Sequence, residues 1–412
     1  MVIANISYTR DSKTVTLSAD ISFRGKKTEQ AYITTDRKYE KFIARDASPF
    51  LAAVLLPCMK SQEDIYVEGT ISERLFKNTK EIMDLVQGWN IGLEEIKVRS
   101  NGVTQDKSKP KYTASFFTAG VDSFYTYLKH KNIKSTKISH LVLVHGFDVP
   151  LSNKAFFKKV RTTVENVAKQ EKVHAVILET NIGEIIEKRL VWDFAHGGAL
   201  AAVALMLRKN LKTVLVPGAV RNNQLFPYGT HPALDKLWST ETMKVKSDGG
   251  EHDRIGKIVK VVSKSPLALK YLRVCTQNIK GKYNCSRCFK CLMTMMYLEG
   301  TGMLKQAKTF EKKIDLAAVR KMYYDYKLKY NIQGEQALAL LRKNKQNPAL
   351  QKAIEISLKK SMRPTLMKRV YMGIAAFDQK YNDRRLYQLV FTMNNGDRNI
   401  LFKYLFKRGL LK

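Results

Sequence analysis

The sequence predicts an α/β protein built on a doubly wound parallel sheet, and three observations indicate this fold class. From residue 111 onward, short apolar segments alternate with segments of helical periodicity, as strands and helices of a parallel sheet do. The first hundred residues mix half-alternating strand patterns with two helical patterns. After residue 300 the pattern is helical, with basic residues on the faces opposite the apolar ones. A chain of 412 residues is long enough for two or three domains.

Residues 1–105 are predicted to form an N-terminal α+β module. Its β-branched, partly alternating segments are typical of half-buried strands: Val2–Tyr8, Thr14–Phe23, Ala31–Thr35 and Ile65–Ile71. Two segments have helical patterns, Ala47–Met59 and Ser72–Trp89. The polar, turn-rich segment Asn101–Pro110 follows and is predicted to be a linker.

Residues 111–300 are predicted to form the central domain with the parallel sheet. Strands are expected at Tyr112–Phe117, Ser139–His145, Ala175–Glu179, Thr213–Pro217 and Ile258–Val262. Helices are expected at Asp122–Lys131, Lys154–Lys169, Ile182–Val191, Gly197–Lys209 and Ser265–Val274. Ligands of such sheets bind beyond the carboxyl ends of the strands, so the residues that follow each strand are candidates for a site.

Residues 301–412 are predicted to form a basic helical domain, with helical patterns at Phe310–Lys329, Glu335–Leu341, Leu350–Lys360 and Arg384–Phe391. This segment holds 25 Lys and Arg against 8 Asp and Glu, in a chain of net charge +35. Such an excess favours an acidic partner, either a protein or a nucleic acid. The alternative is a basic surface that is merely solvated, and no recognisable nucleic-acid-binding signature accompanies the charge.

The segment Tyr112–Phe124 is the most informative part of the chain, because a buried strand leads through a turn of small residues into a helix. The turn is Thr118-Ala-Gly120, and the helix is expected to begin near Asp122. Backbone N–H groups and the positive end of a helix dipole make such a turn an anion site, to which the hydroxyls of Thr118 and Ser123 add donors. The alternative is an ordinary strand-to-helix turn that Asp122 or Ser123 caps.

Four of the five cysteines lie in one short window, as Cys275, Cys285, Cys288 and Cys291. The spacing C-x9-C-x2-C-x2-C allows four thiolates to converge on one tetrahedral Zn²⁺, which makes a structural zinc site the preferred interpretation. Disulfides are disfavoured because no secretory signal is visible, whereas an iron–sulfur cluster remains an alternative. The fifth cysteine, Cys58, lies in an apolar segment and is expected in the core.

The two motifs together carry a resemblance to a known family. Thr118-Ala-Gly-Val-Asp-Ser123 is similar to the S-G-G-x-D-S loop of the PP-loop ATP pyrophosphatases, with Thr118 in place of Ser and Ala119 in place of Gly. Ala119 fits this loop without strain only if its φ stays negative. A PP-loop followed by a four-cysteine knuckle resembles the 7-cyano-7-deazaguanine synthase family over residues 110–300, and the flanking hundred residues on each side have no counterpart there.

The resemblance implies a HUP-type, Rossmann-like central domain and an enzyme that uses ATP, Mg²⁺ and a structural Zn²⁺. Such a ligase adenylates a carboxylate with release of pyrophosphate and then forms a C–N bond, on a small-molecule or carrier-bound substrate. Two alternatives stay open. One is a PP-loop enzyme that modifies tRNA or another nucleic acid, for example by thiolation. The other is a non-catalytic module that only binds nucleotide or nucleic acid.

The resemblance also implies roles for individual residues. The loop Thr118–Ser123, including Val121, would hold the phosphates, with Asp122 and Ser123 taking part in the chemistry. Gly146, after the second strand of the domain, would lie near the nucleotide. Independently of the resemblance, Arg221 lies in a polar, turn-rich loop after a predicted strand and is a candidate to hold a phosphate or carboxylate. Arg254 first, and Lys257 second, would meet the leaving pyrophosphate, the alternative being a capping role for this segment.

Two observations bear on the compartment. Met1-Val-Ile-Ala-Asn5 has no basic stretch before an apolar run, as a signal peptide would have. The longest apolar run, near Ala199–Leu207, is too short to span a bilayer. A cytoplasmic protein is therefore expected.

Overall fold

The computed structural model describes residues 1–279, 282–324 and 331–362, and these residues fall into two compact units. The first unit comprises Met1–Val274 with Gln306–Thr309. The second comprises Cys275–Lys305 and the described residues from Phe310 onward. The candidate phosphate loop belongs to the first unit and the four-cysteine window to the second, so each is described within its own unit.

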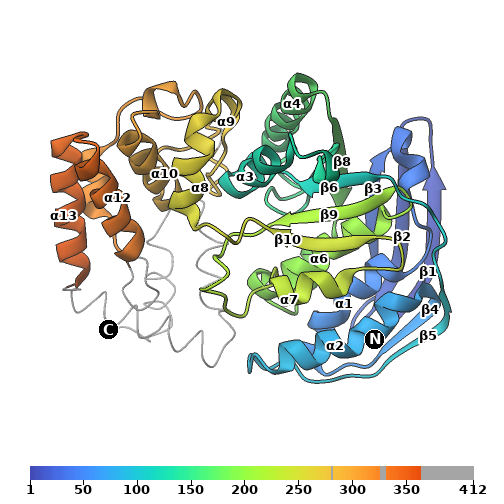
Figure 1. The fold of residues 1–412 in the computed structure, drawn as a ribbon. Coiled ribbons are helices and arrows are strands. Elements are labelled where there is room, and N and C mark those ends of the chain that lie inside the picture. Colours follow the sequence, from blue (N-terminus) through green and yellow to red (C-terminus); the bar gives the residue numbers. More distant parts are fainter. Residues whose placement is uncertain (280–281, 325–330, 363–412) are drawn as a thin grey trace. The chain divides into compact units, whose positions relative to one another are not determined.

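The first unit is an α/β structure with one ten-stranded, mixed and mostly parallel sheet (Figure 1). The strands lie side by side in the order β10 (Lys244–Asp248), β9 (Leu211–Pro217), β6 (Tyr112–Phe116), β7 (His140–His145), β8 (His174–Thr180), β3 (Glu29–Asp36), β2 (Thr14–Ser22), β1 (Val2–Arg10), β4 (Ile65–Ser72) and β5 (Val98–Thr104). The pairs β8–β3, β3–β2 and β2–β1 are antiparallel, and the other neighbouring pairs are parallel.

Helices cover both faces of the parallel part of this sheet (Figure 1). The unit contains α1 (Ser48–Ser61), α2 (Glu73–Gln87), α3 (Val121–His130), α4 (Lys154–Glu171), α5 (Ile182–Glu187), α6 (Trp192–Met206), α7 (Pro232–Asp235), α8 (Arg254–Lys260) and α9 (Pro266–Tyr271). In β7, Val142 and Val144 join the large core that includes α1 and α6, whereas Leu141 and Leu143 are buried outside that core. Successive side chains of a strand point to opposite faces, so both faces of β7 are covered. This explains the continuous apolar pattern of the strand.

The N-terminal hundred residues are joined to the rest of the first unit rather than set apart from it. β3 pairs with β8 in the register Ile33 opposite Thr180, which covers what would otherwise be an exposed sheet edge. Helix α1 packs against α6 so closely that a Cβ on Gly198 would lie 2.4 Å from the carbonyl oxygen of Ala52. Gly198 therefore serves the packing of these two helices.

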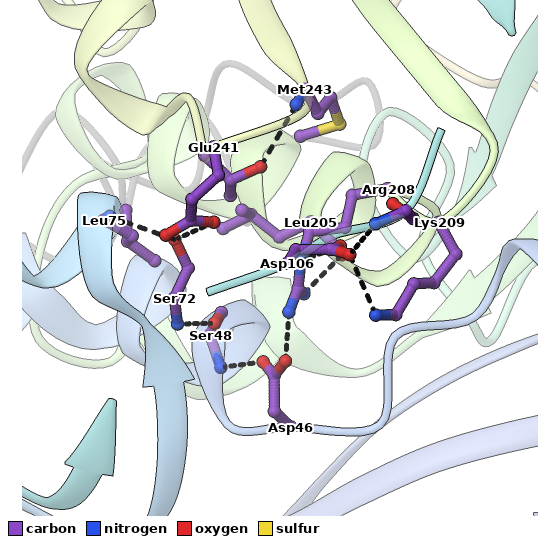
Figure 2. Close-up of polar contacts among 12 residues, drawn as sticks. Asp46, Ser48, Ser72, Leu75, Asp106, Leu205, Arg208, Lys209, Glu241 and Met243 are labelled. Atoms are coloured by element: carbon purple, nitrogen blue, oxygen red, sulfur yellow. Dashed lines mark hydrogen bonds and ion pairs between the residues drawn. The ribbon is translucent and has the colours of Figure 1, made fainter. Parts of the chain in front are cut away.

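A buried polar network reinforces this junction (Figure 2). The guanidinium of Arg208, whose side chain is 1% exposed, pairs with Asp46 from the N-terminal part and lies 3.6 Å from Asp106. Lys209 Nζ is 3.1 Å from the second oxygen of Asp106. Nearby, Ser72 donates a hydrogen bond from its hydroxyl to Glu241 at 3.1 Å. The carboxylates of Asp46 and Asp106 thus offset the buried guanidinium of Arg208, because a buried charge needs opposite charges beside it.

The expected linker at Asn101–Pro110 and the expected boundary at residues 105–111 fall inside the first unit. Strand β5 extends to Thr104 and pairs with β4, and the Asp106 carboxylate is held by Arg208 and Lys209. The two compact units meet in the sequence between residues 274 and 275. Asn101–Thr104, expected as part of a turn-rich linker, belongs to β5, because local composition carries no information on long-range strand pairing.

Two expected elements of the sheet differ in the structure. Ile258–Val262, expected as a strand, lies in α8 and the start of the 3₁₀ turn Val262–Lys264. The reason is a helix start at Asp253, whose carboxylate accepts a hydrogen bond from the N–H of Gly256 at 2.8 Å. The fifth parallel strand is instead β10, which the sequence analysis missed because an edge strand needs few apolar residues.

The second unit contains α10 (Phe289–Gly300), α11 (Leu316–Lys321), α12 (Asn331–Lys343) and α13 (Pro348–Met362). Close packing joins the first and third of these, since a Cβ on Gly300 would lie 2.8 Å from the Leu340 side chain. The helix expected over Phe310–Lys329 is much shorter, because Asp315 caps a new start by accepting from the N–H of Ala318 at 3.0 Å. The helix expected at Arg384–Phe391 lies outside the described residues.

Candidate functional site

The candidate phosphate loop follows β6 and leads directly into α3. Ala119 has φ +58° and is fully buried, and Gly120 then takes an extended conformation with φ −78° and ψ 172° as the N-cap residue. The condition under which Ala119 would fit the loop without strain, a negative φ, is therefore not met. Ala119 lies in the left-handed region of backbone conformation, between the end of β6 and the start of α3. A non-glycine residue there costs about 1–2 kcal/mol.

The strained turn is held by hydrogen bonds on both sides. The N–H of Arg273 donates to the carbonyl of Ala119 at 2.8 Å. The Ser123 hydroxyl donates to the carbonyl of Gly120 at 3.1 Å, and the N–H of Phe124 donates to the same carbonyl at 2.9 Å. No side chain among the described residues caps the N-terminus of α3. The first N–H groups of this ten-residue helix thus keep the capacity to bind an anion.

The loop lies where the strand order of the parallel region reverses. From β6 the chain moves outward through β7 and β8, then returns to the other side of β6 with β9 and continues to β10. β6 and β9 are neighbours in the sheet. The connection after β6 leads to β7 on one side of this pair, and the connection after β9 leads to β10 on the other side. In open α/β sheets this reversal point is where ligands bind.

Lys257 joins the two loops at this point. Its side chain is fully buried, and its ammonium donates to Asp122 Oδ1 at 2.7 Å and to the carbonyl of Gly218, the first residue after β9. Asp122 belongs to the first turn of α3, and Lys257 to α8. A buried ammonium needs such partners, because desolvation of an unpaired charge is costly.

Arg254 lies one turn before Lys257 and pairs with the other oxygen of Asp122 at 3.5 Å. Its side chain is 26% exposed, whereas that of Lys257 is buried. The structure thus brings together Asp122, Arg254 and Lys257, which the sequence analysis selected separately. Of the two cations, only Arg254 is accessible to a ligand, and Lys257 is placed to position Asp122 and the loop after β9.

A second layer of charged groups supports this cluster from α3 and the turn after β10. Lys129 pairs with Asp248 at 2.8 Å and with Glu251 at 2.7 Å, and Tyr125 donates to Glu251 at 2.7 Å. Burial opposes ionisation of both acids, but hydrogen bonds from Lys129 and Tyr125 lower the pKa of Glu251 to about 2, and those from His130 and Lys129 lower the pKa of Asp248. No local sequence pattern marks these residues, because their pairing depends on tertiary contacts.

The loops after β9 and β10 are tied to each other. The N–H of Asn222 donates to the carbonyl of Gly250 at 2.7 Å, and a Cβ on Gly250 would collide with the Asn222 side chain at 2.0 Å. Arg221 precedes this contact and its side chain is exposed. Gly249 has φ +90° and packs against Tyr125, which explains why this turn needs glycine.

Gly146 follows β7 and has φ +103°. A Cβ there would lie 1.9 Å from the carbonyl oxygen of Thr180, so close packing of two loops accounts for this glycine without a ligand. Arg273, which was not selected from the sequence, holds the candidate phosphate loop through its backbone N–H, which donates to the carbonyl of Ala119. Its buried guanidinium lies over the Phe156 ring at 5.3 Å and 3.9 Å from Asp148.

In the second unit, the four cysteines form one compact cluster. Their sulfur atoms all lie within 4.8 Å of one another, and the sulfurs of Cys285 and Cys291 are 3.8 Å apart. Cys288 is the N-cap residue of α10, and its N–H donates to the sulfur of Cys285 at 3.2 Å. Hydrogen bonds from the other thiols, led by Cys275, lower the pKa of Cys285, which favours its thiolate.

This geometry fits a single metal ion. With Zn–S bonds of about 2.3 Å, the edges of a tetrahedron of sulfur atoms measure about 3.8 Å. In a four-iron cluster each thiolate binds a different iron, which holds the sulfurs farther apart. The cluster can therefore hold one metal ion such as zinc. The fifth thiol, Cys58, is buried in α1, and burial raises its pKa.

Comparisons with known proteins add no further constraint: no family model, curated protein or solved structure matches the chain. In the described part of the chain, no helix has the length and apolar character needed to cross a membrane.

Proposed function

We propose that the chain is a PP-loop ATP pyrophosphatase of the 7-cyano-7-deazaguanine synthase type, a ligase that adenylates a carboxylate. The observation that carries the proposal is the position of the loop Thr118–Ser123 at the reversal of strand order, with an uncapped helix N-terminus behind it. The five parallel strands lie side by side as β8, β7, β6, β9 and β10. When β6 is numbered 1 and the others follow in chain order, this arrangement is 3-2-1-4-5, the order of Rossmann-like nucleotide-binding sheets.

The proposed reaction has two steps. A carboxylate oxygen of the substrate attacks the α-phosphorus of ATP, the bond from that phosphorus to the bridging oxygen breaks, and pyrophosphate leaves. An amine nitrogen then attacks the acyl carbon and a C–N bond forms. The bond from that carbon to the phosphate oxygen of AMP breaks, AMP leaves, and the nitrogen gives up a proton to water. Mg²⁺ bound with the triphosphate would neutralise charge as it moves to the leaving group.

In this proposal, different residues of the first unit bind the phosphates, contact the leaving pyrophosphate and position the loop. The N–H groups of Val121, Asp122 and Ser123 at the start of α3 would bind phosphate oxygens, with Thr118 adding a hydroxyl. Arg254, the accessible cation of the cluster, would meet the leaving pyrophosphate. Lys257 acts through Asp122 and is a positioning residue. The zinc ion, where bound by the four cysteines, supplies a structural crosslink within the second unit.

Thiolation is less well supported than ligation. Sulfur transfer requires a reactive thiolate, and four of the five cysteines belong to the compact cluster. The remaining thiol, Cys58, has no exposure and a raised pKa. A nucleic-acid substrate for the ligase itself stays compatible with the charge of +35.

Calorimetry of ATP with magnesium tests the proposal. We expect the wild type to bind, and Asp122→Asn/Ser123→Ala to bind at least tenfold more weakly, because the loop loses its anchor to Lys257 and a hydroxyl. Since Asp122→Asn also removes a partner of a buried cation, the thermal stability of each variant is measured alongside.

Arg254→Met provides a second, structurally mild variant, because the side chain is partly exposed and its ion pair is long. It should weaken ATP binding without loss of stability. Lys134→Met is the matched control, since this exposed lysine lies before β7, at the opposite edge of the sheet. A wild type that does not bind ATP, or equal losses in both variants, would contradict the proposal.

A further inference from the structure

A pocket of about 510 Å³ on the first unit is lined almost entirely by cationic side chains. Its lining residues, here called the basic pocket, are Lys26, Lys27, Glu29, Lys188 and Arg189. Lys26 and Lys27 belong to the turn between β2 and β3, and Lys188 and Arg189 follow α5. Two segments distant in the sequence thus build one concave, positively charged surface.

Arg189 gives the basic pocket a fixed wall. Its guanidinium lies 3.4 Å above the Phe23 ring and donates to the carbonyl of Ile185 at 2.8 Å and to Glu29 Oε1 at 3.2 Å. The side chain is only 13% exposed. A stacked, hydrogen-bonded guanidinium loses little further freedom when an anion binds beside it.

The single acid of the basic pocket is already neutralised. Glu29 pairs with both Lys188 and Arg189, and although burial opposes it, their hydrogen bonds lower the pKa of this carboxyl. Lys26 and Lys27 are exposed and take part in no ion pair with a described residue. Four cations against one carboxylate leave a local excess of three positive charges.

The basic pocket and the candidate phosphate loop both lie at the edge of the sheet that is formed by the carboxyl ends of the parallel strands β6, β7 and β8. β3 begins at Glu29 and runs antiparallel to β8, so its start lies beside the carboxyl end of β8. β6, β7 and β8 are parallel, so the loop after β6 leaves the same edge. Across the sheet, three strand spacings of about 4.8 Å separate β6 from β3. Glu29 lies four residues beyond Ile33, which pairs with the last residue of β8, so the basic pocket extends beyond the carboxyl ends of the parallel strands.

We propose that the basic pocket binds phosphate groups of a polyanion that extends along this edge of the sheet. Lys and Arg form charge-assisted hydrogen bonds with phosphate oxygens, and several cations around an open pocket suit a ligand with several phosphates. The two sources of this chemistry are a free polyphosphate and the backbone of a single-stranded nucleic acid. The inference does not depend on the proposed ligase activity.

Fluorescence anisotropy with a labelled single-stranded 12-mer oligonucleotide, at low and moderate salt, tests the inference on the full-length protein. We expect the wild type to bind and Lys26→Glu/Lys27→Glu to bind at least tenfold more weakly, with a flatter dependence on salt. Lys26→Gln/Lys27→Gln should fall between them. Both residues are exposed on a turn, so the variants should keep the thermal stability of the wild type.

The matched control is Lys134→Glu/Lys137→Glu, which makes the same change of charge at the opposite edge of the sheet, before β7. We expect its affinity to stay within threefold of the wild type. Competition by inorganic triphosphate would identify free polyphosphate as a sufficient ligand, and competition by unlabelled oligonucleotide alone would identify the nucleic-acid backbone.

Three results would overturn the inference. One is a wild type that binds neither the labelled oligonucleotide in the anisotropy measurement nor inorganic triphosphate in a direct calorimetric titration. Another is an equal loss of affinity in the pocket and control variants, which would reflect net charge alone. The third is displacement of the oligonucleotide by poly-glutamate but not by triphosphate, which would assign the pocket to an acidic protein.

Discussion

The backbone conformation of Ala119 is the most unusual feature of the candidate phosphate loop. Its φ of +58° lies where a Cβ is strained, yet the residue is buried and held by the N–H of Arg273. Strain of this kind persists only where the surroundings enforce it, and it is frequent at ligand sites. The same position is Gly in the PP-loop motif that the sequence resembles, which fits the conformation.

Substitutions at Ala119 test this conformation. Ala119→Gly should leave the free energy of unfolding within about 1 kcal/mol of the wild type, because relief of strain offsets greater freedom of the unfolded chain. Ala119→Val should destabilise by more than about 2 kcal/mol, since a β-branched residue fits the left-handed region poorly. Urea unfolding measures both, and a Val variant as stable as the Gly variant would rule out the positive φ.

At the scale of elements, the charged cluster exists because α3, α8 and the end of β9 meet. Lys257 binds Asp122 and the carbonyl of Gly218, so no one element holds the group alone. The sequence predicted β6, the turn and the start of α3 from local pattern. It could not predict β10 or the join of β3 to β8, because strand pairing depends on residues far apart in the chain.

The same limit applies to the candidate site. Asp122, Arg254 and Lys257 were selected from motif and turn chemistry, and the structure brings them together. The supporting residues Lys129, Asp248 and Glu251 carry no local pattern that separates them from ordinary surface charges. The division of the chain at residue 274 was likewise invisible in the composition.

The aromatic packing at the start of β7 predicts a dependence of stability on pH. His140 is 3% exposed and its ring lies 4.8 Å from Tyr112 and 4.9 Å from His174. Burial, with a smaller effect of His174, lowers the pKa of His140 to about 4 from an ordinary value of 6.5. Below pH 6.5 the unfolded chain therefore takes up a proton that the folded chain does not, and stability falls.

Between pH 7 and pH 4.5 this residue should cost the folded state about 2–3 kcal/mol. His140→Phe should remove that part of the dependence, so the variant should lose less stability on acidification than the wild type. Urea unfolding at the two pH values checks this. Parallel losses in both proteins would contradict the role given to His140.

At the scale of the whole molecule, the two units carry separate chemistry. The first holds the candidate nucleotide site and the basic pocket, and the second holds the cysteine cluster. A metal bound by residues separated along the chain stabilises a fold directly, because the unfolded chain does not keep the site.

The purified protein should therefore contain one zinc ion per chain, measured by elemental analysis. Cys288→Ser should lower zinc content and the thermal stability of the second unit. Cys58→Ser, which changes the one cysteine outside the cluster, should keep the full zinc content. Iron with the visible absorption of an iron–sulfur cluster, or zinc content that Cys288→Ser leaves unchanged, would contradict a zinc site.

The central claim is that ATP binds where the loop after β6 meets α3. The N–H groups of the first turn of α3 lack intrahelical acceptors, so their hydrogen exchange should be fast until phosphate oxygens bind them. Hydrogen–deuterium exchange with and without ATP and magnesium measures this without knowledge of the second substrate. The account predicts slower exchange in peptides that cover residues 118–124 and 218–224. Unchanged exchange in both peptides at saturating ATP, or protection confined to other parts of the chain, would contradict it.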